Sequence, residues 1–179
     1  MAEADRITED SKKLIVGLLN EAMQVEYGVI LNYPRILDRI VHMDQVQSQD
    51  FADSVERLGR DSFRHATVVA KLIEDLGGEP AWDMVVIDRM IDVESMLVEQ
   101  LGKEKLMTSV YKEARQIAQK SPAKAKGFFD RLKNIGQEPR EEVSRSKVIE
   151  ILTGLESDEQ SHIKRVENAL IQMNIKSEN

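Results

Sequence analysis

Three glutamates and two histidines interrupt the apolar positions of four long stretches of this 179-residue sequence. They are Glu26, His65, Glu104, Glu159 and His162. Each stands where the period of an amphipathic helix calls for a buried side chain. Because burying an unpaired carboxylate is costly, such residues are normally ion-paired, protonated or bound to a metal. Oxygen and imidazole ligands suit iron or manganese, and they suit zinc less well when no thiolate is present.

Taken one at a time, these residues have ordinary structural interpretations. A glutamate at the edge of an apolar stripe can reach solvent, and a buried histidine can be a core residue with satisfied hydrogen bonds. The combination is more specific, because every stretch contributes a carboxylate or an imidazole at a matching depth. The segment Glu159-Gln160-Ser161-His162 places two of them on one helix face, one turn apart. The joint pattern predicts a metal site in the core of a helical protein.

The composition favours helices and excludes several kinds of chemistry. Hydrophobic residues make up 41% of the chain, so it can bury a core, whereas 4% aromatics, 9 glycines and 4 prolines are few for a β protein. The absence of cysteine excludes disulfides, iron–sulfur clusters and a cysteine nucleophile. A net charge of −7 without a basic stripe argues against nucleic acid and membrane partners. No targeting segment is visible, and we expect a cytoplasmic protein.

The periodic stretches predict one domain, 1–179, made of four long helices. Their expected ranges are residues 9–42, 50–76, 92–120 and 140–173. Thr8 is a suitable N-cap for the first helix, and Gly77-Gly78 is a suitable stop for the second. A long connection follows the second helix, and residues 121–139 between the third and fourth helices could contain a short extra helix. Helices of this length with one apolar face predict an all-α four-helix bundle.

The motifs around the candidate ligands resemble those of the ferritin-like superfamily of di-iron carboxylate proteins, with the bacterioferritin and rubrerythrin branches nearest. The matching segments are Glu26 followed seven residues later by Tyr33, Arg64-His65-Ala66 running into Leu76-Gly77-Gly78-Glu79-Pro80, Asp92 to Leu97 followed by Glu104, and Asp158-Glu159-Gln160-Ser161-His162. The resemblance covers nearly the whole chain except the 121–139 insertion. It implies a long crossover between the second and third helices.

The resemblance also implies the roles of the candidate residues. Glu26 and Glu104 would be terminal metal ligands, His65 and His162 the imidazole ligands, and Glu159 a bridging carboxylate. The implied cofactor is iron, with up to two ions, and manganese or zinc as alternatives. The implied activity is oxidation of Fe(II) or reduction of peroxide, with dioxygen or peroxide as the reaction partner. Relatives of this kind form homo-oligomers, and we expect a dimer.

Two residues depart from the family pattern. Ser62 stands where the second helix should supply a bridging glutamate, and its neutral hydroxyl is a poor ligand. Asp61 is adjacent, but one residue along a helix turns a side chain by about 100°. The site would therefore hold one ion, hold two weakly, keep an open bridging position, or be degenerate. Phe63 occupies the place of a haem-ligating methionine, so we expect no haem.

Two other functions stay open on the sequence. A bundle that had lost its metal chemistry would act as a scaffold or interaction protein, and its buried acids would have raised pKa values. A hydroxylase of an organic substrate would keep the centre and add an apolar pocket. Tyr33 and Tyr111 each follow a candidate ligand by seven residues, which allows either a hydrogen bond at the site or simple core packing.

Overall fold

The computed structural model describes residues 5–41, 49–82, 92–121 and 143–177. These residues form four long helices: α1 (Glu9–Val41), α2 (Gln49–Asp75), α3 (Val93–Lys120) and α5 (Arg145–Ser177). No strand occurs in the part of the chain that the structure describes. The all-α four-helix prediction is therefore confirmed. The predicted extra helix after the third long helix lies outside the described residues.

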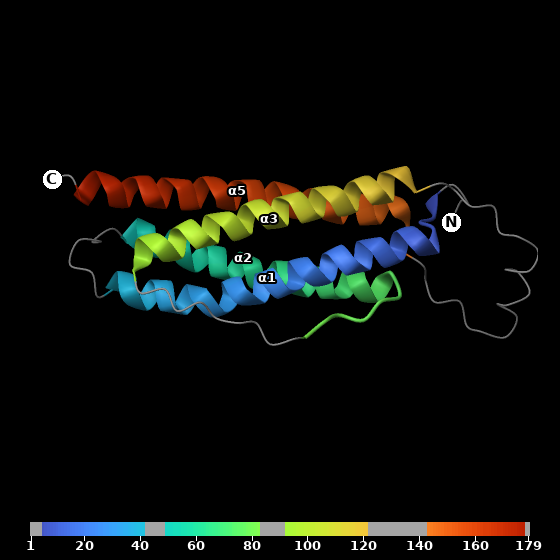
Figure 1. Ribbon diagram of the computed structural model, residues 1–179, viewed down its shortest axis with the longest axis horizontal. Coiled ribbons are helices and arrows are strands. Elements are labelled where there is room, and N and C mark those ends of the chain that lie inside the picture. The colour runs from blue at the N-terminus through green and yellow to red at the C-terminus, as the bar shows by residue number, and fades with distance from the viewer. Residues whose placement is uncertain (1–4, 42–48, 83–91, 122–142, 178–179) are drawn as a thin grey trace, which may run out of the picture.

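The four helices lie side by side as a long bundle (Figure 1). α1 packs against α2 and α3, and α5 packs closely against α3 and more loosely against α2. α1 runs antiparallel to α2, and α3 runs antiparallel to α5 (Figure 1). α2 ends at one end of the bundle and α3 begins at the other, with part of the connecting chain outside the described residues. All four helices face one shared core.

Side chains just before the helices satisfy their first backbone N–H groups. The Thr8 hydroxyl accepts a hydrogen bond from the Ser11 N–H at 3.3 Å, which caps α1. Asp92 caps α3 through the Ser95 N–H at 2.7 Å. Ser144 accepts from the Lys147 N–H at 3.2 Å, so α5 begins at Arg145 rather than near residue 140 as the sequence pattern suggested.

The end of α2 is a Schellman motif. The Gly78 N–H donates to the Ile73 carbonyl and the Gly77 N–H donates to the Glu74 carbonyl, both at 2.9 Å. Gly77 adopts a φ of 83°, a conformation that glycine reaches at little cost. Gly78 lies close to Val16 of α1, where an added Cβ would stand 2.6 Å from a Val16 methyl group. The pair of glycines therefore both ends α2 and lets it approach α1.

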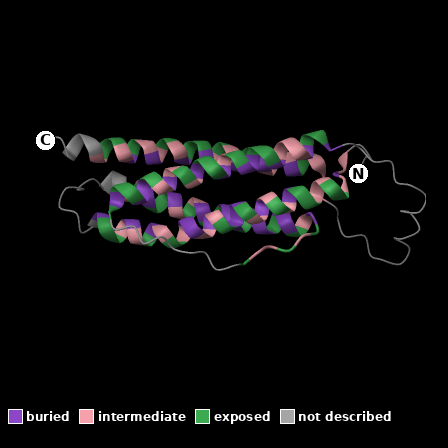
Figure 2. Ribbon diagram, viewed as in Figure 1, coloured by how far each residue is buried: buried purple, intermediate pink, exposed green. Residues whose placement is uncertain are grey.

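The inward faces of the helices are buried and the outward faces are exposed along the length of the bundle (Figure 2). By length and composition alone, Glu9–Ile40 could cross a membrane, with a mean hydropathy of 1.4. Many of its apolar side chains form part of the core that the four helices share, whereas Leu14 and Leu31 are exposed. Among the described residues eight polar side chains are buried: Glu26, Ser62, His65, Gln100, Glu104, Ser121, Glu159 and His162.

Candidate metal centre

The five side chains singled out from the sequence meet in the core of the bundle. Glu26 comes from α1, His65 from α2, Glu104 from α3, and Glu159 and His162 from α5. Each is at most 1% exposed. The helical period places each of them on the inward face of its helix, and the bundle brings the four faces together.

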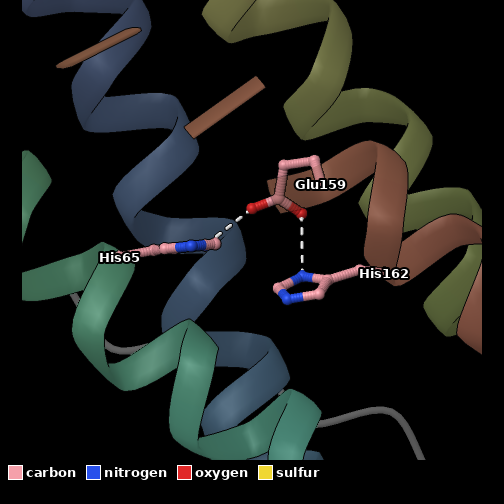
Figure 3. Close-up of side chains that lie close together, drawn as sticks. All are labelled: His65, Glu159 and His162. Carbon is pink, nitrogen blue, oxygen red and sulfur yellow. Dashed lines mark ion pairs between the residues drawn. The ribbon is translucent and has the colours of Figure 1, made fainter. Parts of the chain in front are cut away.

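The side chains form two half-sites joined by one carboxylate. In the first half-site, His65 Nδ1 lies 3.3 Å from Glu26 Oε1. In the second half-site, His162 Nδ1 lies 3.2 Å from Glu104 Oε2. Glu159 lies between them, with Oε1 2.7 Å from His65 Nδ1 and Oε2 3.4 Å from His162 Nδ1 (Figure 3). One carboxylate thus reaches both imidazoles.

Three of these four separations suit atoms that share a metal ion, whereas the 2.7 Å between His65 Nδ1 and Glu159 Oε1 is shorter. Ligand atoms about 2.1 Å from one ion, at angles of about 90–110°, stand roughly 3.0–3.4 Å apart. One ligand atom each from His65, Glu159 and His162 lies within 4.8 Å of the other two. The two imidazole rings are stacked with centroids 5.3 Å apart, which leaves both Nδ1 atoms on the carboxylate side.

Several of these atoms have no hydrogen bond in the part of the chain that the structure describes. They are Glu26 Oε2, both carboxylate oxygens of Glu159, and His65 Nδ1. His65 Nδ1 and Glu159 Oε1 are close, but they are not aligned as a hydrogen bond. Buried polar atoms without partners are rare because each costs free energy. The lone pairs left over are those that a bound cation would use, so the donor set fits a metal ion.

Two aspartates hold the far nitrogens of the imidazoles in a crossed arrangement. His65 Nε2, on α2, lies 3.3 Å from Asp158 Oδ2 on α5. His162 Nε2, on α5, lies 3.3 Å from Asp61 Oδ2 on α2. Such contacts fix the tautomer of a ligating histidine and orient its ring. They leave Nδ1 of both rings free to face the centre.

Sequence reasoning missed this role of the two aspartates, although a signal was present. Asp61 precedes His65 by four residues, and Asp158 precedes His162 by the same number. Each aspartate contacts the histidine of the opposite helix and not the one on its own helix. Asp61 is therefore an orienting group and not a replacement ligand for the missing glutamate.

Two arginines neutralise the aspartates at the seam between α2 and α5. Arg64 donates to Asp158 at 2.7 Å, and Arg165 donates to Asp61 at 3.2 Å. Both aspartate pKa values lie below their usual range, since these arginines and the histidines outweigh the effect of burial. The two ion pairs contribute no net charge beside the centre.

Two further side chains donate hydrogen bonds to Glu26 and Glu104. The Tyr111 hydroxyl donates to Glu26 Oε1 at 3.1 Å. The Gln100 amide donates to Glu104 Oε1, from one turn earlier on α3. Tyr33 has the same spacing from Glu26 as Tyr111 has from Glu104, but its buried hydroxyl has no hydrogen bond among the described residues. The sequence did not reveal Gln100 and did not distinguish the two tyrosines.

Without metal, protons balance the charge of the cluster. Burial works to lower the pKa of His65, but Glu159 and Glu26 outweigh it and raise that pKa to about 10. Burial likewise opposes charge on His162, whose pKa Glu104 and Glu159 raise to about 10. Burial, with the adjacent Glu104 carboxylate, raises the pKa of Glu159 to about 8. Metal binding would have to displace these protons.

The two departures from the family pattern have separate structural consequences. Ser62 is buried, and its hydroxyl has no hydrogen bond among the described residues. It precedes His65 by three residues, as Glu159 precedes His162, so α2 offers no carboxylate in that position. Phe63 is 65% exposed on the outside of the bundle. It lines an apolar hollow of about 310 Å³ between α1 and α2, together with Tyr33 and Gly59.

Comparison with solved structures places the fold among known proteins. A ferritin-like, diiron-carboxylate protein of Bacillus anthracis has 20% identity and a TM-score of 0.66, over 89% of this chain and 97% of that one. The bacterioferritin-related dodecameric thioferritin of Bacteroides fragilis has 15% identity and a TM-score of 0.67, over 93% and 90%. The bacterioferritin of Desulfovibrio desulfuricans, described with a diiron site, has 20% identity and a TM-score of 0.62, over 93% and 83%.

No protein-family model matches the chain, and no curated protein matches it in sequence. The structural likeness covers between 83% and 97% of the three proteins' chains. The chain therefore has the ferritin-like four-helix fold, as the sequence motifs indicated. At this level of identity the likeness establishes the fold, and the function has to be argued from the site.

Proposed function

We propose that this chain is a ferritin-like iron protein whose centre binds two adjacent divalent ions and supports oxidation of Fe(II) by dioxygen or hydrogen peroxide. The observation that carries the proposal is the pair of half-sites, each with a buried glutamate and a histidine, joined by Glu159. Manganese would fit the same oxygen and nitrogen ligands, and zinc would fit less well. A cytoplasmic location and a homodimer belong to the same proposal.

The side chains have distinct tasks in this proposal. Glu26 and Glu104 would each hold one ion, and Glu159 would hold both. His65 and His162 would be neutral ligands through Nδ1, because their Nε2 atoms face the aspartates. The apolar core around the centre excludes bulk water, which strengthens the attraction between carboxylates and cations.

Iron would enter this reaction as the substrate that is oxidised. Two Fe(II) ions each lose one electron. Hydrogen peroxide takes these two electrons and two protons to give two water molecules, whereas dioxygen takes the same number to give hydrogen peroxide. The centre supplies two ions side by side, so that both electrons leave from one place.

Metal stoichiometry tests the proposal. The chain would be purified without metal, titrated anaerobically with Fe(II), and analysed for iron per chain. We expect wild type to bind iron and Glu159→Gln to lose most of it, since the variant removes the ligand shared by both half-sites. Glu150→Gln is the matched control, because Glu150 lies on the same helix with a 70% exposed side chain. Mixing the loaded protein with peroxide should then oxidise Fe(II) faster than free iron is oxidised.

Equal iron content in wild type and Glu159→Gln would refute the site. If neither Fe(II) nor a chelator changes the metal content or the thermal stability of wild type, the chain is instead a metal-free scaffold. Circular dichroism of each variant would show whether its helices are intact, so that lost binding is separated from lost folding.

Hydroxylation of an apolar organic compound is a second candidate, favoured by the hollow between α1 and α2. Tyr33 lines this hollow. Its pKa is raised first by burial and then by the charges of Glu104 and Glu159, so it also lies near the centre. With an external two-electron donor, dioxygen would place one oxygen atom in a C–H bond and leave the other as water. Donor-dependent oxygen consumption that apolar compounds stimulate would support this function.

A further inference from the structure

The two halves of the centre are related by an approximate symmetry that one residue breaks. α2 carries Asp61, Ser62 and His65, and α5 carries Asp158, Glu159 and His162 at identical spacing. The crossed aspartate contacts obey the symmetry, with the same 3.3 Å separation on both sides. A carboxylate spans the two imidazoles from α5, whereas α2 offers a buried hydroxyl with no hydrogen bond among the described residues.

The charges of the described side chains leave a loaded centre short of one anion. This argument rests on the proposed function, in which two divalent ions bind. Glu26, Glu104 and Glu159 offset three of the four positive charges, and metal-bound histidines are neutral. Asp158 and Asp61 add no net negative charge, because Arg64 and Arg165 pair with them. One uncompensated positive charge would remain in an apolar core, which is strongly unfavourable.

We propose that a small carboxylate from solution, of the size of formate, completes the centre beside Ser62 and is required for tight binding of the second metal ion. Its two oxygens would span the half-sites from α2 as the oxygens of Glu159 span them from α5. Formate has as many non-hydrogen atoms as a serine side chain lacks relative to glutamate. The Ser62 hydroxyl, which is 0% exposed, would gain an acceptor for its proton.

The test is a titration of the full chain with Mn(II), in sodium formate or in sodium chloride at equal ionic strength. We expect one ion to bind in both salts. We expect the second ion to bind at least about tenfold more tightly in formate, which is a common size for coupling between two ligands. The effect must be reciprocal, so added Mn(II) should tighten formate binding equally. Infrared spectra should then contain carboxylate bands that shift when carbon-13 formate replaces the ordinary isotope.

Variants separate the role of Ser62 from general effects of charge. Ser62→Glu supplies the missing carboxylate from the chain, so it should bind two ions in either salt and show no formate bands. Thr67→Glu is the control, because it adds the same charge at an exposed position of α2. It should behave like wild type. The wild-type titration decides the question by itself if Ser62→Glu does not fold.

Two outcomes would overturn the inference. If wild type binds both ions equally well in the two salts, no carboxylate from solution is needed, although the proposed function stands. If no metal binds to wild type or to Ser62→Glu, the proposed function fails and the inference fails with it.

Discussion

Replacing Glu159 by glutamine should stabilise the metal-free protein and weaken the metal-loaded one. Burial raises the pKa of Glu159 to about 8, so its carboxyl holds a proton at pH 7 in the folded chain. Glutamine has the size and charge of that protonated carboxyl. In the unfolded chain the carboxyl of Glu159 ionises freely, which favours unfolding of wild type only. The metal-free stability of wild type is thus reduced by a residue that the proposed function assigns to metal binding.

The size of the effect follows from the pKa values. In the unfolded chain the carboxyl of Glu159 has its usual pKa of 4.5. Keeping it protonated in the folded chain costs about 1.4 kcal/mol for each pH unit between 4.5 and 7, or about 3 kcal/mol in total. The glutamine amide would be imperfectly hydrogen-bonded in the core, which reduces the stability gain of the variant by about 1 kcal/mol. We therefore expect Glu159→Gln to raise the free energy of unfolding at pH 7 by about 2 kcal/mol. For a chain of this length that is a rise in Tm of roughly 4–8 °C.

The gain should depend on pH in a defined direction. The folded-state pKa of Glu159 is raised, so wild type loses stability as pH rises from 4.5 through about 8, whereas the glutamine variant does not. The advantage of the variant should be near zero at pH 4.5 and largest at pH 8. Adding Fe(II) or Mn(II) should reverse the order, because a ligand stabilises only the protein that binds it.

Thermal unfolding in chelator, followed by circular dichroism at several pH values, measures these differences. Glu150→Gln should change Tm by less than about 2 °C at every pH, since exposed ion pairs one turn apart on a helix contribute about 0.2–0.5 kcal/mol. An unchanged or lower Tm for Glu159→Gln in chelator would refute the reasoning. A gain of equal size at pH 5 and pH 8 would show that its source is packing rather than proton binding.

Three other results are expected. Asp158→Asn should weaken metal binding by about 10- to 100-fold with intact helices, since it loosens the orientation of His65; unchanged affinity by metal titration would contradict this. Metal binding at pH 7 in weak buffer should release the protons of His65, His162 and Glu159, so that affinity rises with pH; a titration without acidification would argue against ligation by these groups. Gly78→Ala should lower the free energy of unfolding, measured with denaturant, by about 1–3 kcal/mol, because its Cβ would press on α1. It should leave the metal stoichiometry unchanged.

Local signals in the sequence account for most of what could be predicted about the fold. The period of apolar residues marked the inward face of each helix, and Gly77-Gly78 marked the end of α2. The start of α5 was placed too early, because the apolar period does not reveal that Ser144 caps the helix. Residues that a helix brings together within one or two turns are visible in sequence, because helical geometry is nearly constant.

The same rule explains why the five candidate ligands could be found. Glu159 and His162 share a face by their spacing alone, and Glu26, His65 and Glu104 interrupt apolar stripes at similar depth. The sequence therefore predicts which ionisable groups are buried. It also reveals that Ser62 stands in place of a carboxylate, because Ser62 precedes His65 by the same spacing as Glu159 precedes His162.

Contacts between helices were decided only by the tertiary structure. Asp61 and Asp158 each precede a histidine by four residues, which the sequence shows, but each contacts the histidine of the opposite helix, which the spacing does not show. Tyr33 and Tyr111 have the same spacing from a glutamate, yet within the described part of the chain only the Tyr111 hydroxyl donates to one, Glu26 on α1. The sequence determined which side chains face inward, because that depends on the helical period. The rotation and depth of each helix in the bundle determined which of them touch, because these come from packing among all four helices.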